Sequence, residues 1–143
     1  MKWLFICIGI VVAAASCKTA KEATKTTTPL FDTRWSLKKI YNDGKEEEVN
    51  TKAFIRFDKE KGSAGGNGSC NSFGSSASVN GNEVSFKNIF STKMYCEQVQ
   101  QIENKYLRQL QNANRFEIKE KALTLYRDKE KLLEFLAEEK TGN

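Results

Sequence analysis

Residues 73–87 read FGSSASVNGNEVSFK, two short segments joined by Asn80-Gly81. An Asn-Gly pair between segments of this kind is a strong signal for a β-hairpin, because both residues tolerate the positive φ of the tight turn. Val84 and Phe86 then lie on one face of the returning strand. We therefore predict an antiparallel hairpin at residues 73–87.

Alternating apolar residues recur on both sides of this hairpin, between turn signals at short intervals. Each such segment places apolar side chains on one face, as expected for a strand that is half-buried. The predicted strands are residues 33–41, 53–58, 73–79, 83–87, 115–119, 122–127 and 132–137. Residues 63–68 are small and Gly-rich, so we expect any strand there to be irregular.

One segment, residues 97–113, has helical rather than alternating spacing. Its apolar residues form a single stripe, widened by Leu107, and they are Val99, Ile102, Tyr106, Leu110 and Ala113. We predict a helix that lies across one face or one open end of the sheet. Its polar residues are expected mostly in solvent, and they are Glu97, Gln100, Glu103, Lys105 and Arg108.

Seven or eight antiparallel strands with one helix predict a mainly β, α+β domain. The expected architecture is a small, barrel-like curved sheet with the helix packed on it. Closure of the sheet would remove its exposed edges. An open sheet with the helix on one face has the same pattern, and the sequence leaves both forms open.

The first 16 residues have the layout of a bacterial export signal. Lys2 precedes an uncharged run at residues 4–15, which is too short to span a bilayer as a stable helix. The residues AASC at 14–17 resemble the lipobox of bacterial lipoproteins, although Ala14 stands where that motif usually has Leu. The resemblance implies acylation of Cys17; ordinary secretion after cleavage near Ala15 is the alternative.

Residues 17–30 form the predicted tether, because 18–28 contain no large apolar residue. The domain is predicted to span residues 31–143. Lys18 follows Cys17, and by resemblance to the sorting rule of enteric bacteria this favours the outer membrane, on its periplasmic or surface face. The net charge of +5 comes from charges of alternating sign, with no basic stripe, so we expect no nucleic-acid partner.

After processing, the domain keeps only Cys70 and Cys96. Two thiols in an oxidising compartment usually pair, so we predict a disulfide, with two buried free thiols as the alternative. The chain has no His, which removes the commonest general base and the Ser-His-Asp and Cys-His arrangements. Two cysteines alone cannot complete a zinc site. We expect no enzymatic activity, no catalytic residue, no metal and no cofactor.

The segments around both cysteines resemble a known family. GNGSCNSFG at 66–74 resembles the G-x-CN-x-F-x-G block of META-domain proteins, and STKMYC at 91–96 resembles their T-x-M-x-C block. ENKYLRQL at 103–110 matches the family's E-x-x-aromatic-L-x-x-L helix, and WSL at 35–37 and LTL at 123–125 also correspond. The nearest resemblance is to HslJ-like heat-shock lipoproteins of the bacterial envelope. It implies a barrel-like sheet with one helix and a link to envelope stress and novobiocin resistance, but no established molecular activity.

Asn71 and Tyr95 are the candidate binding or turn-stabilising residues. The Asn71 amide is expected to cap or bridge the turn beside Cys70, with a ligand contact at the barrel mouth as the alternative. Phe73 and Tyr106 are expected in the core.

The sequence is compatible with two classes of function. The first is a monomeric, non-enzymatic binding or structural module, held at the membrane by its lipid near an unidentified envelope protein. The second is a carrier of a small apolar ligand, with a cavity lined by residues such as Trp35, Phe57 and Phe86. Inhibition of a secreted hydrolase is a variant of the first function, and no residue selects it.

Overall fold

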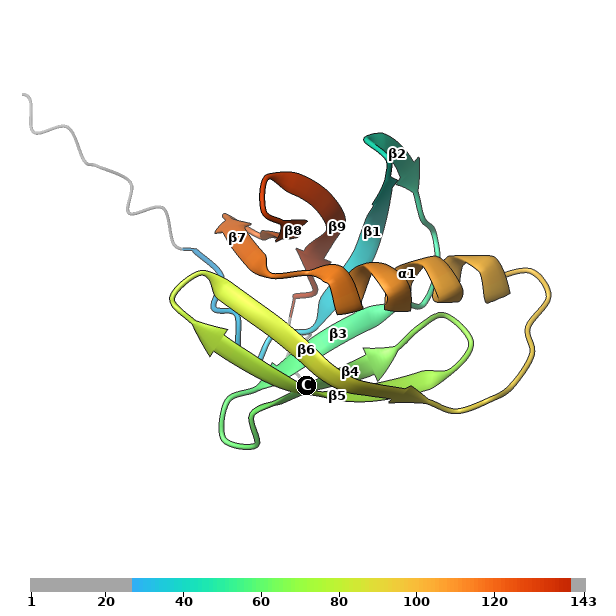
Figure 1. Ribbon diagram of the computed structural model, residues 1–143, viewed down its shortest axis with the longest axis horizontal. Helices are drawn as coiled ribbons and strands as arrows, with labels where there is room; N and C mark the ends of the chain where they lie inside the picture. Colours follow the sequence, from blue (N-terminus) through green and yellow to red (C-terminus); the bar gives the residue numbers. More distant parts are fainter. Residues whose placement is uncertain (1–26, 140–143) are drawn as a thin grey trace, which may run out of the picture.

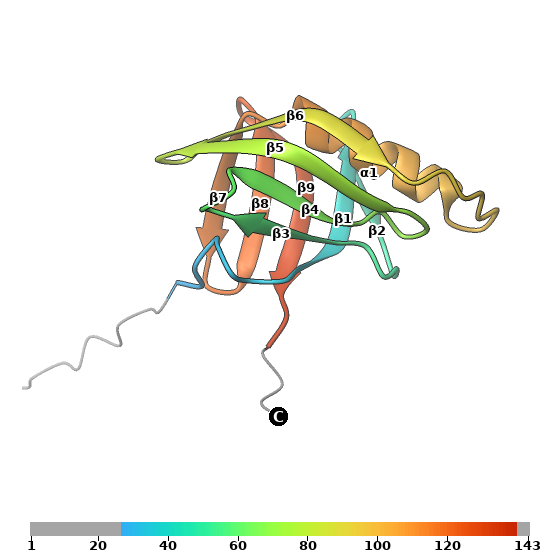
Figure 2. The ribbon, with the colours of Figure 1, turned by 90° about the horizontal axis from the view of Figure 1, so that it is seen from below.

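The computed structural model describes residues 27–139, which form nine strands and one helix. In chain order the elements are β1 (Trp35–Asn42), β2 (Lys45–Glu48), β3 (Phe54–Asp58), β4 (Ser63–Asn67), β5 (Ser72–Asn80), β6 (Glu83–Ser91), α1 (Gln100–Asn112), β7 (Arg115–Lys119), β8 (Ala122–Arg127) and β9 (Glu130–Ala137). The strands pair antiparallel in the order β2-β1-β3-β4-β5-β6-β7-β8-β9, and β1 also pairs with β9 (Figures 1 and 2). The predicted curved sheet is confirmed, and it is ring-like.

The ring is weakest between β6 and β7. Their register contains a single pair, Glu83 opposite Arg115, followed by a backbone hydrogen bond from the Val84 N–H to the Asn114 C=O at 3.1 Å. Beyond this point α1 packs against β6, β9 and β1 (Figure 1). The helix therefore covers the part of the ring that the two strands do not close.

The core lies inside the curved sheet and under α1. Trp35, Tyr106 and Phe135 are its largest fully buried side chains. The Trp35 indole N–H donates to the Leu30 C=O at 2.9 Å, as a buried indole requires a partner. Phe73 packs edge-to-face on Tyr106 with ring centroids 5.6 Å apart. Both residues lie in the core, as expected.

Two strands differ in kind from the prediction, and β6 runs four residues past its predicted end at Lys87. β2 was not predicted because its sequence, KEEE, has no apolar residue. It forms because the turn at Asp43-Gly44, where both residues have positive φ, returns the chain beside β1. A cross-strand ion pair joins Lys39 to Glu46 at 2.8 Å. β4 is regular despite its glycines, since it pairs along its whole length with both β3 and β5.

The helix begins at Gln100, three residues later than predicted. The prediction that Glu103 lies in solvent is wrong, because this residue is only 2% exposed. The buried side chains of α1 are Glu103, Tyr106 and Leu110, whereas Ile102 is half-buried. Spacings of three and four residues place Glu103 on the buried stripe, and backbone N–H groups meet its carboxylate there.

Close packing begins earlier than the predicted domain boundary at residue 31. Leu30, which we assigned to the tether, is 7% exposed and belongs to the core. The Thr28 N–H also donates to the Glu120 C=O at 3.0 Å. The predicted signal peptide, Cys17 and the tether up to residue 26 lie outside the described residues. Within residues 27–139, no helix has the length and apolar character needed to cross a membrane.

Candidate binding surface at the disulfide loop

The helix α1 carries a buried carboxylate. Glu103 Oε2 accepts hydrogen bonds from the backbone N–H of Cys70 at 3.0 Å and of Asn71 at 2.7 Å, and Oε1 accepts one from Asn71 Nδ2 at 2.7 Å. Burial of an ionised carboxylate is costly unless its oxygens are hydrogen-bonded, and three donors meet that need. A Cβ at Gly68 would lie 2.6 Å from Glu103 Oε2, so only glycine permits this approach. Glu103 therefore holds residues 68–71 against the helix.

Asn71 connects this carboxylate to the segment after β6. Its Nδ2 also donates to the Met94 C=O at 2.9 Å, while its Oδ1 accepts from the Met94 N–H and from Thr92 Oγ1, both at 2.8 Å. The residue is 2% exposed. One side chain thus bonds both backbone groups of Met94 and the helix carboxylate, which is the bridging role that the sequence indicated for it.

The disulfide adds a covalent link beside these hydrogen bonds. Cys70 and Cys96 are joined, with Cα atoms 5.9 Å apart, which confirms the predicted pairing. The Thr92 N–H donates to the Ser72 C=O at 3.1 Å, and the Cys96 C=O accepts the Gln100 N–H at 2.9 Å. The backbone of residues 92–96 is therefore held at its start, its middle and its end.

Three large apolar side chains are exposed on and beside this segment. Phe90, Met94 and Tyr95, which we call the apolar tip, have 69%, 60% and 78% of their surface exposed. The Phe90 ring covers Gly74, where a Cβ would lie 2.6 Å from Phe90 Cζ. A hollow of about 350 Å³ adjoins the tip, lined by Asn71, Ser91, Thr92, Lys93, Met94, Tyr95, Gln100, Glu103, Asn104 and Leu107. Three exposed large apolar side chains within six residues of the chain mark a candidate interaction surface.

The family model of the META domain matches residues 28–140. This chain belongs to the META domain family. The META domain described here therefore includes every strand, the helix and the disulfide. A comparison with curated proteins found no match.

The META domain of this chain is similar to three solved structures. A protein from Burkholderia xenovorans, solved by NMR, is 24% identical, with 76% of this chain and 83% of that chain covered and a TM-score of 0.65. A second NMR structure is 24% identical, with 73% and 88% covered and a TM-score of 0.53. The crystal structure of a DUF4847 family protein from Bacteroides vulgatus ATCC 8482 is 14% identical, with 72% and 90% covered and a TM-score of 0.55. At these identities the likeness shows the fold alone.

The structure brings the three META-like sequence blocks to one place. Asn71 belongs to the first block, Met94 to the second and Glu103 to the third, and direct hydrogen bonds connect them. Sequence reasoning missed the roles of Glu103 and Met94, and it did not single out Phe90. Two signals for Glu103 were present, its place in the resemblance and its spacing of four residues from Val99 and three from Tyr106, but its residue type favoured solvent.

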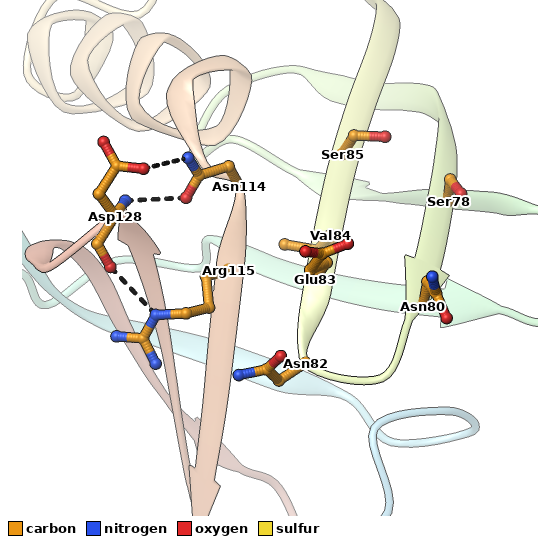
Figure 3. Close-up of a pocket in the computed structure, with 9 residues that line it drawn as sticks. All are labelled: Ser78, Asn80, Asn82, Glu83, Val84, Ser85, Asn114, Arg115 and Asp128. Atoms are coloured by element: carbon orange, nitrogen blue, oxygen red, sulfur yellow. Dashed lines mark hydrogen bonds between the residues drawn. The ribbon is translucent and has the colours of Figure 1, made fainter.

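A second hollow, of about 420 Å³, lies at the seam between β6 and β7 (Figure 3). Most of its lining is polar: Ser78, Asn80, Asn82, Glu83, Val84, Ser85, Asn114, Arg115 and Asp128. Asn114 Nδ2 donates to Asp128 Oδ1, and the Asp128 N–H donates to Asn114 Oδ1, both at 2.8 Å. Arg115 Nε donates to the Asp128 C=O at 3.0 Å. These bonds join the start of β7 to the β8–β9 turn, on one side of the seam.

Arg115 also organises the face of β7 and β8. Its guanidinium lies 4.0 Å from the ring centroid of Tyr126, a cation–π contact. Its hydrogen bond to Glu117, at 2.8 Å, lowers the pKa of that carboxyl. Burial, with the hydrogen bond to Glu117, raises the pKa of Tyr126. Among residues 27–139, no three His, Cys, Asp or Glu side chains are placed to hold a metal ion.

The residues predicted to line an apolar cavity lie in the core. Trp35, Phe57 and Phe86 are all buried, and the rings of Phe57 and Phe86 are 5.9 Å apart. Phe57 also borders hollows at the surface, at one end of the barrel. Tyr106 is fully buried beneath the disulfide region, and its burial raises the pKa of its hydroxyl well above the ordinary value.

Proposed function

We propose that this chain is a lipid-anchored protein of the bacterial envelope whose META domain is a non-enzymatic binding module, with the apolar tip as its contact surface. The observation that carries the proposal is the combination of exposure and rigidity at Met94. Its side chain is 60% exposed, although Asn71 bonds both of its backbone groups. A surface fixed in advance binds with a smaller loss of conformational entropy.

The expected binding energy of the tip is modest. Complete burial of three large apolar side chains that are now mostly exposed contributes about 3–6 kcal/mol before the cost of association. Contacts of this size give stable complexes only with further contacts or with a high local concentration of the partner. Acylation of Cys17 would supply that concentration, because it would confine the domain to a membrane surface.

The position of the tip favours a protein partner over the anchoring bilayer. The described chain begins at one end of the domain, and the loop between β6 and α1 lies at the other end (Figures 1 and 2). With the domain extended from its tether, the apolar tip faces away from the anchor. We therefore expect another envelope protein as the partner. By resemblance to HslJ-like lipoproteins, we also expect cells without the chain to tolerate envelope stress or novobiocin less well.

A photo-crosslinking amino acid at position 95 tests the proposed surface in intact cells. The matched control carries the same amino acid in place of Lys129, an exposed residue of the β8–β9 turn. We expect a discrete crosslinked protein from position 95 and none from position 129. The proposal is rejected if position 95 gives no discrete product or only those of the control. The intact mass of the protein from membranes tests the lipid on Cys17 separately.

A further inference from the structure

The N-terminal part of the described chain crosses one end of the barrel. Residues 28–33, which we call the strap, run past the end of β3 to β1 (Figure 2, blue). Thr28 is hydrogen-bonded to the β7–β8 turn, the Leu30 C=O accepts the Trp35 indole N–H, and Phe31 forms a parallel bridge with Phe57. The strap is thereby tied to several strands of the ring.

A hollow of about 490 Å³ lies beside the strap, between the β3–β4 and β5–β6 turns. Its apolar lining comes from Phe31, Phe57, Ala77 and Val79, of which all but Phe57 are half-buried. Ala77 and Val79 alternate with the outward-facing residues of β5, so the hollow reaches the edge of the core. Its volume lies within the roughly 300–1,000 Å³ of small-molecule sites. This end of the barrel therefore offers an apolar surface that a ligand can reach.

The rim of the hollow carries the positive charge of Lys59. Lys59 Nζ lies 5.9 Å from the centroid of the Phe31 ring. No carboxylate among residues 27–139 lies within ion-pair distance of it; Asp58, which also lines the hollow, pairs with Lys61 at 3.2 Å. An anionic group at the rim would thus meet a free ammonium group, and an attached chain would meet Phe31 and Val79.

We infer that this hollow binds a single-chain anionic amphiphile, such as a fatty acid, with its chain on Phe31, Phe57 and Val79 and its anionic head at Lys59. The location supports this class of ligand. The described chain begins at Thr27, four residues before Phe31 of the hollow, and Cys17 is ten residues upstream of Thr27. Ten residues span at most about 35 Å, so an acylated Cys17 would keep the hollow near the membrane surface. This site is separate from the apolar tip, and each can fail without the other.

The test measures binding of dodecanoate and of uncharged dodecanol, both below their aggregation limits. The protein is the ¹⁵N-labelled chain of residues 17–143 with Cys17→Ser and the disulfide intact. Binding is followed by the chemical shifts of its backbone amides. We expect saturable shifts at Phe31, Ala77 and Val79. Lys59→Gln should lower the affinity for dodecanoate about two- to fivefold, the range of an exposed ion pair, and leave the affinity for dodecanol unchanged.

A second variant tests the apolar lining. Val79→Glu should lower the affinity for both ligands at least about tenfold, because it places a charge on the surface that the alkyl chain of the ligand covers. Phe90→Ser, at the opposite end, should leave both affinities unchanged, and the Lys59→Gln data stand if Val79→Glu fails to fold. The inference is overturned if no saturable shifts occur, if the shifts fall at Met94 and Tyr95 instead, or if Lys59→Gln affects both ligands equally.

Discussion

Replacement of Glu103 by Ala is the sharpest test of the structure around the disulfide. The change removes the acceptor of three hydrogen bonds, two from the backbone N–H groups of Cys70 and Asn71 and one from Asn71 Nδ2. A buried donor without a partner costs about 1–3 kcal/mol. Loss of the buried charge itself offsets part of that cost. We expect the free energy of unfolding to fall by about 3–4 kcal/mol, a large part of the 5–15 kcal/mol typical of a domain.

The assay is equilibrium unfolding in urea with the disulfide intact, followed by the fluorescence of Trp35, the single tryptophan of residues 17–143. Glu103→Gln should lower the free energy of unfolding by about half as much as Glu103→Ala, because the amide keeps one acceptor oxygen. Asn104→Ala is the matched control on the exposed side of the same helix turn, and it should change stability by less than about 0.5 kcal/mol.

The role assigned to Glu103 is refuted if Glu103→Ala lowers the free energy of unfolding by less than about 1 kcal/mol, or by no more than the Asn104→Ala control. The carboxylate would then not be the group that holds residues 68–71 on the helix. A loss equal in Glu103→Gln and Glu103→Ala would show that the charge matters and the acceptor oxygens do not.

Three further changes have defined outcomes. Gly68→Ala should destabilise the domain by about 1–3 kcal/mol in the same urea assay, because the new Cβ displaces the Glu103 carboxylate. Reduction of Cys70–Cys96 should lower the unfolding free energy by about 3.5 kcal/mol, from the loop of 26 residues it closes, and an unchanged midpoint would contradict this. Arg115 lowers the pKa of Glu117 in the folded state, so this carboxyl contributes stability that is present above its unfolded pKa and is lost as the pH falls through the folded value. Stability should therefore decline less between roughly pH 5 and pH 3 in Glu117→Gln than in the parent chain, and equal slopes would contradict the assignment.

Most of the strands could be predicted because they have one buried face. The bounds of β7 and β8 match the prediction, and β3 differs by one residue. In each of these strands the apolar side chains alternate, and a shift of one residue would turn them all to the wrong face. β2 could not be predicted in this way, because its pairing depends on the preceding turn and on β1 and leaves no apolar pattern of its own.

Some features of the candidate surface could be predicted from the sequence, and others could not. The sequence alone indicated the disulfide, since an exported domain with two cysteines usually pairs them. It also indicated a turn-stabilising role for Asn71. The exposed apolar tip was not foreseen, because the sequence does not tell whether Phe90 and Met94 face the core or the solvent.

What the sequence determined by itself was local: the period of the strands, the hairpin turn, the helical stripe and the pairing of two cysteines. Only the tertiary structure decided where Glu103 lies, since its partners Cys70 and Asn71 are 33 and 32 residues away along the chain. The carboxylate of a glutamate is charged and well hydrated in water. It is buried only when folding brings enough N–H donors to its oxygens. That condition depends on the ring of strands and on the helix that covers it, so the helical spacing of Glu103 could not by itself predict its burial.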